Sequence, residues 1–211
     1  MLDRVLYSAL FNGDYPFKDT FREVTTVMEP TQIEDTNSVL IIWGGGDISP
    51  TIYNHPVLKC TGAREELSSR DKYELALAKR AIELGIPVIG VCRGAQMMCA
   101  LAGGFLIQDV SGHTSGHDMK IVASNSLVRT SSLHHQMMYP FDVEHELLAV
   151  ASPTLSKKYV AAIEVLMPSE PEVVWFPQVK ALCIQGHPEF ERDDSPLVQY
   201  CKELINAYCS R

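Results

Sequence analysis

Residues 86–96, with the sequence IPVIGVCRGAQ, decide the fold of this 211-residue chain. The first six form an apolar run rich in β-branched residues, which is typical of a strand buried on both faces of a parallel sheet. This strand leads directly into Cys92, and a helix is expected to follow over 94–101 until Gly103 and Gly104 end it. Cys92 is therefore expected at the carboxyl edge of a sheet, where ligands bind in open α/β folds.

A second buried strand and a helix precede this segment. Residues 38–43 (SVLIIW) form another apolar run, which ends at three glycines, 44–46. Ser68 and Asp71 match a capping box at the start of a helix, and Gly85 supplies its end. Strand, helix and strand at this spacing form a βαβ unit with parallel strands and a right-handed crossover.

The remaining elements complete an α/β pattern. Ser195 and Pro196 predict the start of a final helix with one apolar side. Further short strands are expected at 4–10, 24–28, 105–108, 119–123, 127–130, 147–151, 160–165, 173–176 and 180–185. No repeat or linker divides the sequence. We therefore predict a single domain over residues 1–211, with an open, mostly parallel sheet flanked by helices and some antiparallel additions.

Composition excludes several classes of function. Lys and Arg number 18 against 26 Asp and Glu, which gives a formal charge of −8 and argues against binding to nucleic acid. No stretch of 18 apolar residues predicts a membrane-spanning helix, and the N-terminus does not match a signal peptide. The six cysteines include no CxxC pair, so we expect reduced thiols in a cytoplasmic protein.

Cys92 has the surroundings of a nucleophile. Gly90 and Gly94 allow a tight turn around it, and the dipole of the following helix favours a thiolate. A thiol nucleophile needs a base, and the base needs a group that orients it. His187 and Glu189 follow a predicted strand and would point the same way in an extended chain, so that Glu189 could hold one nitrogen of the imidazole while the other faces Cys92.

The chain resembles the class I glutamine amidotransferases, and within them most closely the peptidase C26 group of γ-glutamyl amide hydrolases. The resemblance implies a flavodoxin-like fold, in agreement with the pattern above. It is carried by residues 44–50 (GGGDISP), 70–71 (RD), 90–96 (GVCRGAQ), 103–105 (GGF), 108–109 (QD), 132–136 (SLHHQ) and 185–189 (QGHPE).

The resemblance also implies roles for individual residues. Cys92 would attack the γ-amide carbon and form a thioester, His187 would act as base and then acid, and Glu189 would orient it. The backbone N–H groups of Gly45 and Arg93 would form the oxyanion hole. The residues implied to bind the substrate are Gly44, Gln96, Ser132 and Leu133.

Three functions remain open on the sequence alone. The first is hydrolysis of a γ-glutamyl amide, either glutamine or a γ-glutamyl amine. The second is a free-standing glutaminase that delivers ammonia to a separate synthetase chain, and the third is an inactive binding module. We expect no metal site, because the four histidines at 113, 117, 134 and 135 lack the spacing of a zinc site. We also expect no cofactor, because the chemistry implied by the resemblance needs neither a metal nor a nucleotide. The glutamate that holds the substrate amino group in some relatives has no counterpart over 111–118, which leaves Asp109 and Asp118 as candidates.

Overall fold

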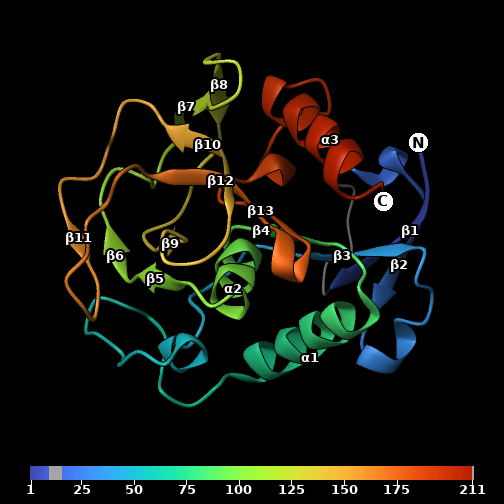
Figure 1. The fold of residues 1–211 in the computed structure, drawn as a ribbon, viewed down its shortest axis with the longest axis horizontal. Coiled ribbons are helices and arrows are strands. Elements are labelled where there is room, and N and C mark those ends of the chain that lie inside the picture. Colours follow the sequence, from blue (N-terminus) through green and yellow to red (C-terminus); the bar gives the residue numbers. More distant parts are fainter. Residues whose placement is uncertain (10–15, 211) are drawn as a thin grey trace.

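The computed structural model describes residues 1–9 and 16–210, and its main sheet has the order β2-β1-β3-β4-β13-β12-β10-β7-β8 (Figure 1). One half is parallel and consists of β1 (Leu2–Ala9), β2 (Phe21–Val27), β3 (Ser38–Ile42), β4 (Val88–Val91) and β13 (Ala181–Ile184). The antiparallel half consists of β12 (Pro171–Phe176), β10 (Glu146–Ala151), β7 (His117–Ile121) and β8 (Leu127–Thr130). This topology confirms the predicted open, flavodoxin-like sheet flanked by helices, and the predicted antiparallel additions form one whole side of it, from β12 to β8.

Within the described residues, two small sheets lie outside the main one. They pair β5 (Phe105–Ile107) with β9 (Met137–Tyr139), and β6 (Asp109–Val110) with β11 (Tyr159–Val160). Short 3-10 turns occur at Lys18–Thr20, Pro30–Gln32, Pro50–Tyr53, Pro177–Val179 and Pro188–Phe190.

Helices cover both faces of the central strands, which explains why those strands are apolar throughout. α1 (Ser69–Leu84) and α2 (Arg93–Leu101) pack on one face with Leu40 and Ile42. α3 (Pro196–Tyr208) packs on the other face with Val39 and Ile41. Alternate residues of one strand thus enter two different cores, as the period of two requires.

The predicted helix caps are present. The Ser68 hydroxyl accepts from the Asp71 N–H at 3.0 Å, and the Asp71 carboxylate accepts from the Ser68 N–H at 2.9 Å. Gly85 ends α1 with a φ of +67°, a conformation that costs glycine little. The Ser195 hydroxyl accepts from the Val198 N–H at the start of α3. None of the helices in the described ranges is both long and apolar enough to cross a membrane.

Some predicted boundaries were wrong. The strand expected at 160–165 is only two residues long, Tyr159–Val160, because its partner β6 is equally short. The first helix after Cys92 begins at Arg93 rather than at residue 94. Residue 10, the expected end of the first strand, lies outside the described residues.

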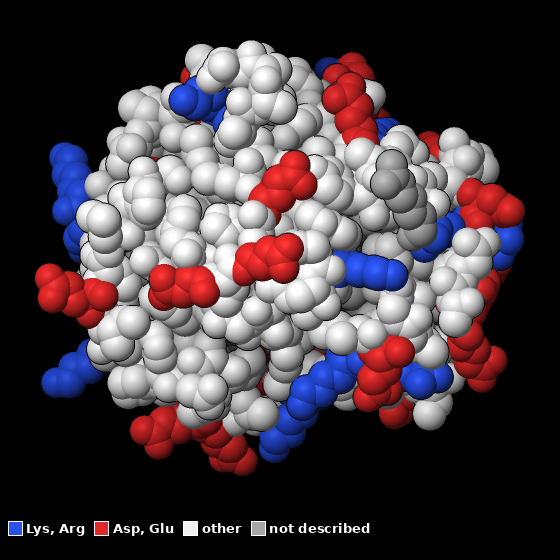
Figure 2. All heavy atoms as spheres, viewed as in Figure 1, with Lys and Arg blue, Asp and Glu red and all other residues white. Residues whose placement is uncertain are grey.

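On the face drawn in Figure 2, basic side chains are scattered among acidic ones.

Candidate active site

Cys92 lies at a sharp corner between β4 and α2. Its φ of +47° and ψ of −104° are unusual for a residue with a Cβ and represent about 1–3 kcal/mol of backbone strain. A Cβ on Gly94 would lie 2.1 Å from the Ile42 carbonyl oxygen, and one on Gly90 would lie 2.6 Å from the Ala95 nitrogen. Both glycines are therefore needed for the helix to begin directly above the sheet.

His187 follows β13, the strand next to β4. Its backbone N–H donates to the Ser131 carbonyl at 3.0 Å, and its Nδ1 lies 2.8 Å from Oε1 of Glu189. Residues Pro188–Phe190 form a 3-10 turn, so the extended chain expected here was wrong. The turn nevertheless brings the Glu189 carboxylate back to the imidazole, and the ring of Phe190 stacks on it at 4.5 Å between centroids.

Gly44 brings the nucleophile and the imidazole together. A Cβ at this position would lie 2.9 Å from His187 Cε1 and 3.5 Å from Cys92 Cβ, so the missing side chain leaves room for both. Burial lowers the pKa of His187, but its interactions with the Cys92 thiol and the Glu189 carboxylate outweigh burial and raise that pKa to about 10. The surroundings therefore favour an imidazolium at neutral pH.

The Arg93 side chain points away from the chemistry into a buried ion cluster. It is 2% exposed, its Nη2 lies 2.5 Å from Oδ1 of Asp71, and its Nη1 contacts Glu74. Burial lowers the pKa of the guanidinium to about 10. The side chain thus anchors the first residue of α2 to α1, while its backbone N–H stands at the N-terminus of the helix directly after Cys92.

Two cavities meet at Cys92. The first, of about 330 Å³, is largely apolar. The second, of about 200 Å³, is more polar. Gly45, Cys92 and Leu133 line both. The apolar cavity is otherwise lined by Trp43, Gly44, His187, Glu189 and Phe190, and side chains lining the polar cavity include Asp47, Gln96, His134, His135 and Gln136.

The predicted substrate-binding residues divide into two groups. Gln96 lines the polar cavity, where its Nε2 donates to the Gln136 carbonyl at 3.1 Å, and Leu133 is 61% exposed at the border of the two cavities. The Ser132 hydroxyl instead donates to the His113 carbonyl at 2.7 Å and is not among the residues that line either cavity.

Asp47 is a residue of the site that had no predicted role, although it lies in the quoted glycine motif. Its carboxylate accepts from the Thr61 hydroxyl at 2.9 Å and the Gly62 N–H at 2.8 Å, and lies 3.1 Å from His135 Nε2. Asp109 faces His135 Nδ1 at 3.5 Å from the other side. A carboxylate in the polar cavity can bind a cationic group of a ligand.

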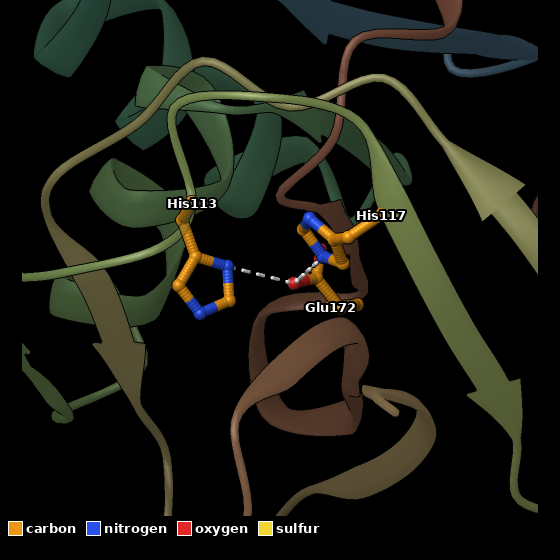
Figure 3. Close-up of side chains that lie close together, drawn as sticks. All are labelled: His113, His117 and Glu172. Atoms are coloured by element: carbon orange, nitrogen blue, oxygen red, sulfur yellow. Dashed lines mark hydrogen bonds and ion pairs between the residues drawn. The ribbon is translucent and has the colours of Figure 1, made fainter. Parts of the chain in front are cut away.

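His113, His117 and Glu172 form a buried histidine–glutamate cluster (Figure 3), and the His113 backbone is hydrogen-bonded to the 132–134 segment. One oxygen of Glu172 is 2.8 Å from His117 Nε2 and 3.3 Å from His113 Nδ1, and His113 Nε2 lies 3.2 Å from Glu170. The sequence did not predict that His113 and His117 share a site, because loop spacing does not reveal such a contact.

The side chains of this cluster could hold either an extra proton on a histidine or a metal ion. The ligand atoms of His113, His117 and Glu172 lie within 4.8 Å of one another, which meets the spacing for a cation. However, a single Glu172 oxygen faces both imidazoles. Burial lowers the pKa of His113, yet both glutamates outweigh it and raise that pKa to about 9, so an imidazolium already balances carboxylate charge. The cluster supports the loop, because the His113 carbonyl accepts from Ser132 and from the His134 N–H.

The open sheet carries a cysteine at the corner between a strand and a helix, and a histidine–glutamate pair follows the neighbouring strand. This is the arrangement of a class I glutamine amidotransferase-like protein. The Peptidase C26 family model matches residues 25–189, and the chain belongs to that family. This finding confirms the resemblance inferred from the motifs.

Individual relatives agree with this assignment. The chain is 32% identical over 104 residues to the glutamine amidotransferase-like protein YvdE homolog of Lactococcus lactis subsp. cremoris, which covers 45% of this chain and 54% of that protein. It is 28% identical over 227 residues to the candidate glutamine amidotransferase Rv2859c of Mycobacterium tuberculosis, covering 94% and 68%. The match thus spans only about half the length of the YvdE homolog.

Solved structures share the fold. A candidate GMP synthase component from Thermoplasma acidophilum superposes with a TM-score of 0.64 at 12% identity and covers 98% of this chain and 92% of its own. At this level of identity, the likeness supports the fold and not a particular reaction.

Proposed function

We propose that this chain hydrolyses γ-glutamyl amide bonds, in glutamine or in a γ-glutamyl amine, through a thioester on Cys92. The observation that carries the proposal is the geometry around Cys92. The strained backbone at Cys92 and the neighbouring Gly44 pack against the imidazole of His187, and Glu189 holds the other side of that ring. We further propose that residues 1–211 form one domain that works in the cytoplasm, where the free cysteines of the described residues stay reduced.

In the first half of the reaction, the Cys92 thiolate attacks the amide carbon and the carbonyl oxygen becomes an oxyanion. The backbone N–H groups of Gly45 and Arg93 donate to this oxygen. The C–N bond then breaks as His187 gives its proton to the leaving nitrogen, and ammonia or an amine departs.

In the second half, water attacks the thioester. His187 takes a proton from the water, the C–S bond breaks, and glutamate leaves with Cys92 restored as the thiolate. Glu189 stays ionised and stabilises the imidazolium whenever it forms. No step needs a metal or a nucleotide, so the proposal includes no cofactor.

The two cavities suggest how a γ-glutamyl amide lies across Cys92. The polar cavity suits the glutamyl head, with Gln96 and Leu133 at its wall and Asp47 as the partner of the ammonium group. The amine portion would enter the apolar cavity between Leu133 and Phe190, which are 61% and 64% exposed. This cavity favours a carbon-bearing amine over ammonia as the leaving group.

A second candidate function is the delivery of ammonia from glutamine to a separate synthetase chain. It is favoured by the exposure of Leu133 and Phe190 at the entrance, which a partner could cover. In that case free glutamine would be the substrate, and turnover of the isolated chain would be slow.

Glutamate release separates these functions. Purified protein would be assayed with glutamine and with γ-glutamyl amides of ethylamine, benzylamine and p-nitroaniline, and the glutamyl-thioester would be sought by intact-mass spectrometry. We expect turnover of the amine substrates that Cys92→Ser abolishes and Cys60→Ser retains, because Cys60 lies outside both cavities. A Cys92→Ser protein as active as the wild type would refute the mechanism, and slow turnover of glutamine alone would favour the partner-dependent function.

A further inference from the structure

We propose that Arg70 is a positioning residue that fixes the orientation of one oxyanion-hole amide, that of Gly45. The inference rests on the proposed function, since it concerns an amide that donates to the oxygen on which negative charge develops. Arg70 itself lines neither of the two cavities at Cys92.

The contacts of Arg70 set the direction of the Gly44–Gly45 peptide. Its Nη2 donates to the Gly44 carbonyl at 2.8 Å and to the Trp43 carbonyl at 3.2 Å. The C=O and N–H of a trans peptide point in opposite directions. Because the Gly44 carbonyl points at the guanidinium, the Gly45 N–H points away from it, and Gly45 lines both cavities together with Cys92.

The space beside Gly45 shows how closely the guanidinium approaches this loop. A Cβ on Gly45 would lie 2.1 Å from Nη1 of Arg70, so the arginine occupies the place of a side chain. Removing the arginine would therefore remove both the hydrogen bonds to the carbonyls and the steric support behind the peptide.

A buried carboxylate holds the guanidinium in place. Nε of Arg70 donates to Oε1 of Glu74 at 2.7 Å, and the Glu74 side chain is fully buried. The other oxygen of Glu74 contacts the Arg93 side chain. Since Arg93 supplies the second amide of the proposed oxyanion hole, one carboxylate on α1 anchors the segments that carry both donors.

Without Arg70, the Gly44–Gly45 peptide is free to rotate and turn the Gly44 carbonyl toward the cavities. Two glycines in succession oppose such a rotation only weakly. The loss of one oxyanion donor lowers kcat by about 10²- to 10³-fold. Substrate binding changes less, because the amide contacts the oxygen most strongly in the transition state.

The test compares two reactions of Cys92 in Arg70→Ala. The first is hydrolysis of γ-glutamyl p-nitroanilide and glutamine, which forms an oxyanion. The second is alkylation by iodoacetamide, in which the thiolate displaces iodide at a tetrahedral carbon and no oxyanion forms. We expect kcat to fall by about 10²- to 10³-fold with KM within about threefold. Because the Arg70 charge also acts on Cys92, alkylation is measured across pH, and we expect its rate at the high-pH plateau, where the thiolate is fully formed, to stay within about threefold of the wild type.

Two further variants sharpen the test. Arg80→Ala removes another arginine of α1, one that pairs at the surface with Glu83, and we expect wild-type rates. Arg70→Lys retains the charge but lacks the fork of donors, so we expect only partial activity. Because Arg70 is partly exposed, millimolar guanidinium should restore part of the activity of Arg70→Ala at concentrations that do not denature it.

The outcomes separate this inference from the proposed function. A wild-type protein that releases no glutamate from any substrate rejects both. Where the wild type is active, Arg70→Ala with kcat within about threefold of it rejects the inference alone. A parallel fall of alkylation and kcat also rejects it, since that pattern indicates damage to Cys92 and His187 rather than to the oxyanion hole. Melting curves for every variant check that the fold persists.

Discussion

Gly44→Ala should displace the imidazole from the nucleophile while leaving the fold in place. The added methyl would lie 2.9 Å from His187 Cε1 and 3.3 Å from its Nδ1. Carbon atoms in contact prefer a separation of about 3.5–4.0 Å, so the ring must move by about 0.6–1 Å. Its Nδ1 contact with Glu189 and its stacking on Phe190 oppose that movement.

The size of the effect follows from the displacement. Misplacing a catalytic group by about 1 Å can cost about 10²-fold in rate, and we expect Gly44→Ala to lower kcat by about 10- to 10²-fold. Overpacking at one such site costs about 1–3 kcal/mol of stability. Alkylation of Cys92 by iodoacetamide should also slow, because the imidazolium no longer lies beside the thiolate. This distinguishes the variant from Arg70→Ala, which is expected to retain alkylation.

Gly46→Ala is the matched control, because a Cβ there has nothing within 4 Å. It should retain the wild-type alkylation rate and melting temperature. The assay is the rate of glutamate release beside the rate of iodoacetamide labelling, both below the melting temperature. If Gly44→Ala alkylates and turns over at wild-type rates, the imidazole does not occupy the position described, and the proposed triad geometry is wrong.

Other variants and conditions test the remaining parts of the site. Glu189→Gln should lower kcat by about 10- to 10³-fold. Because His187 must be protonated to donate, wild-type kcat/KM should hold up to about pH 9 and fall through the His187 pKa of about 10, and kcat/KM of the variant should fall at lower pH. Leu133→Ser should lower kcat/KM for γ-glutamyl benzylamide by about 3- to 10-fold but leave glutamine within about twofold, and equal losses for both would contradict the proposed amine cavity. His113→Gln should lower the free energy of unfolding in urea by about 2–4 kcal/mol. Because the pKa of His113 is raised, its stabilising contribution is complete below pH 6.5 and is lost as pH rises through about 9. A stability difference from the wild type that does not change with pH would be contrary evidence. Chelators should leave glutamate release unchanged, and activity lost with a stoichiometric metal would overturn the metal-free mechanism.

Much of the fold follows from local signals in the sequence. The runs SVLIIW and IPVIGV predict buried strands because both of their faces are covered, and the capping box at Ser68 and Asp71 fixes the start of α1 within a single turn. These features depend on neighbours a few residues away. The strand predicted at 160–165 fails because its length is set by a partner, β6, that its own residues do not reveal.

The candidate site divides in the same way. Cys92 and the pair His187–Glu189 can be found from their sequence contexts, whereas the 3-10 turn that brings Glu189 to the imidazole cannot. The contact of Asp47 with His135 joins residues far apart in the chain, and so do the contacts of His113 with Glu170 and Glu172. No periodicity or motif encodes such pairs, since each depends on how separate loops pack over the sheet.

Because β4 and β13 are neighbours in the sheet, the reactivity of the Cys92 thiol shows whether β13 has been added to the sheet. Cys92 follows one strand and His187 the other, and the Cys92 N–H donates to the Ile184 carbonyl at 2.7 Å across the pair. During synthesis the nucleophile emerges more than ninety residues before its base, so a partly made chain carries a cysteine without an imidazole beside it. A slip of two residues between these strands would separate the two side chains by about 6–7 Å. Fast alkylation at neutral pH thus marks chains in which the late strand β13 has joined the sheet in its correct register.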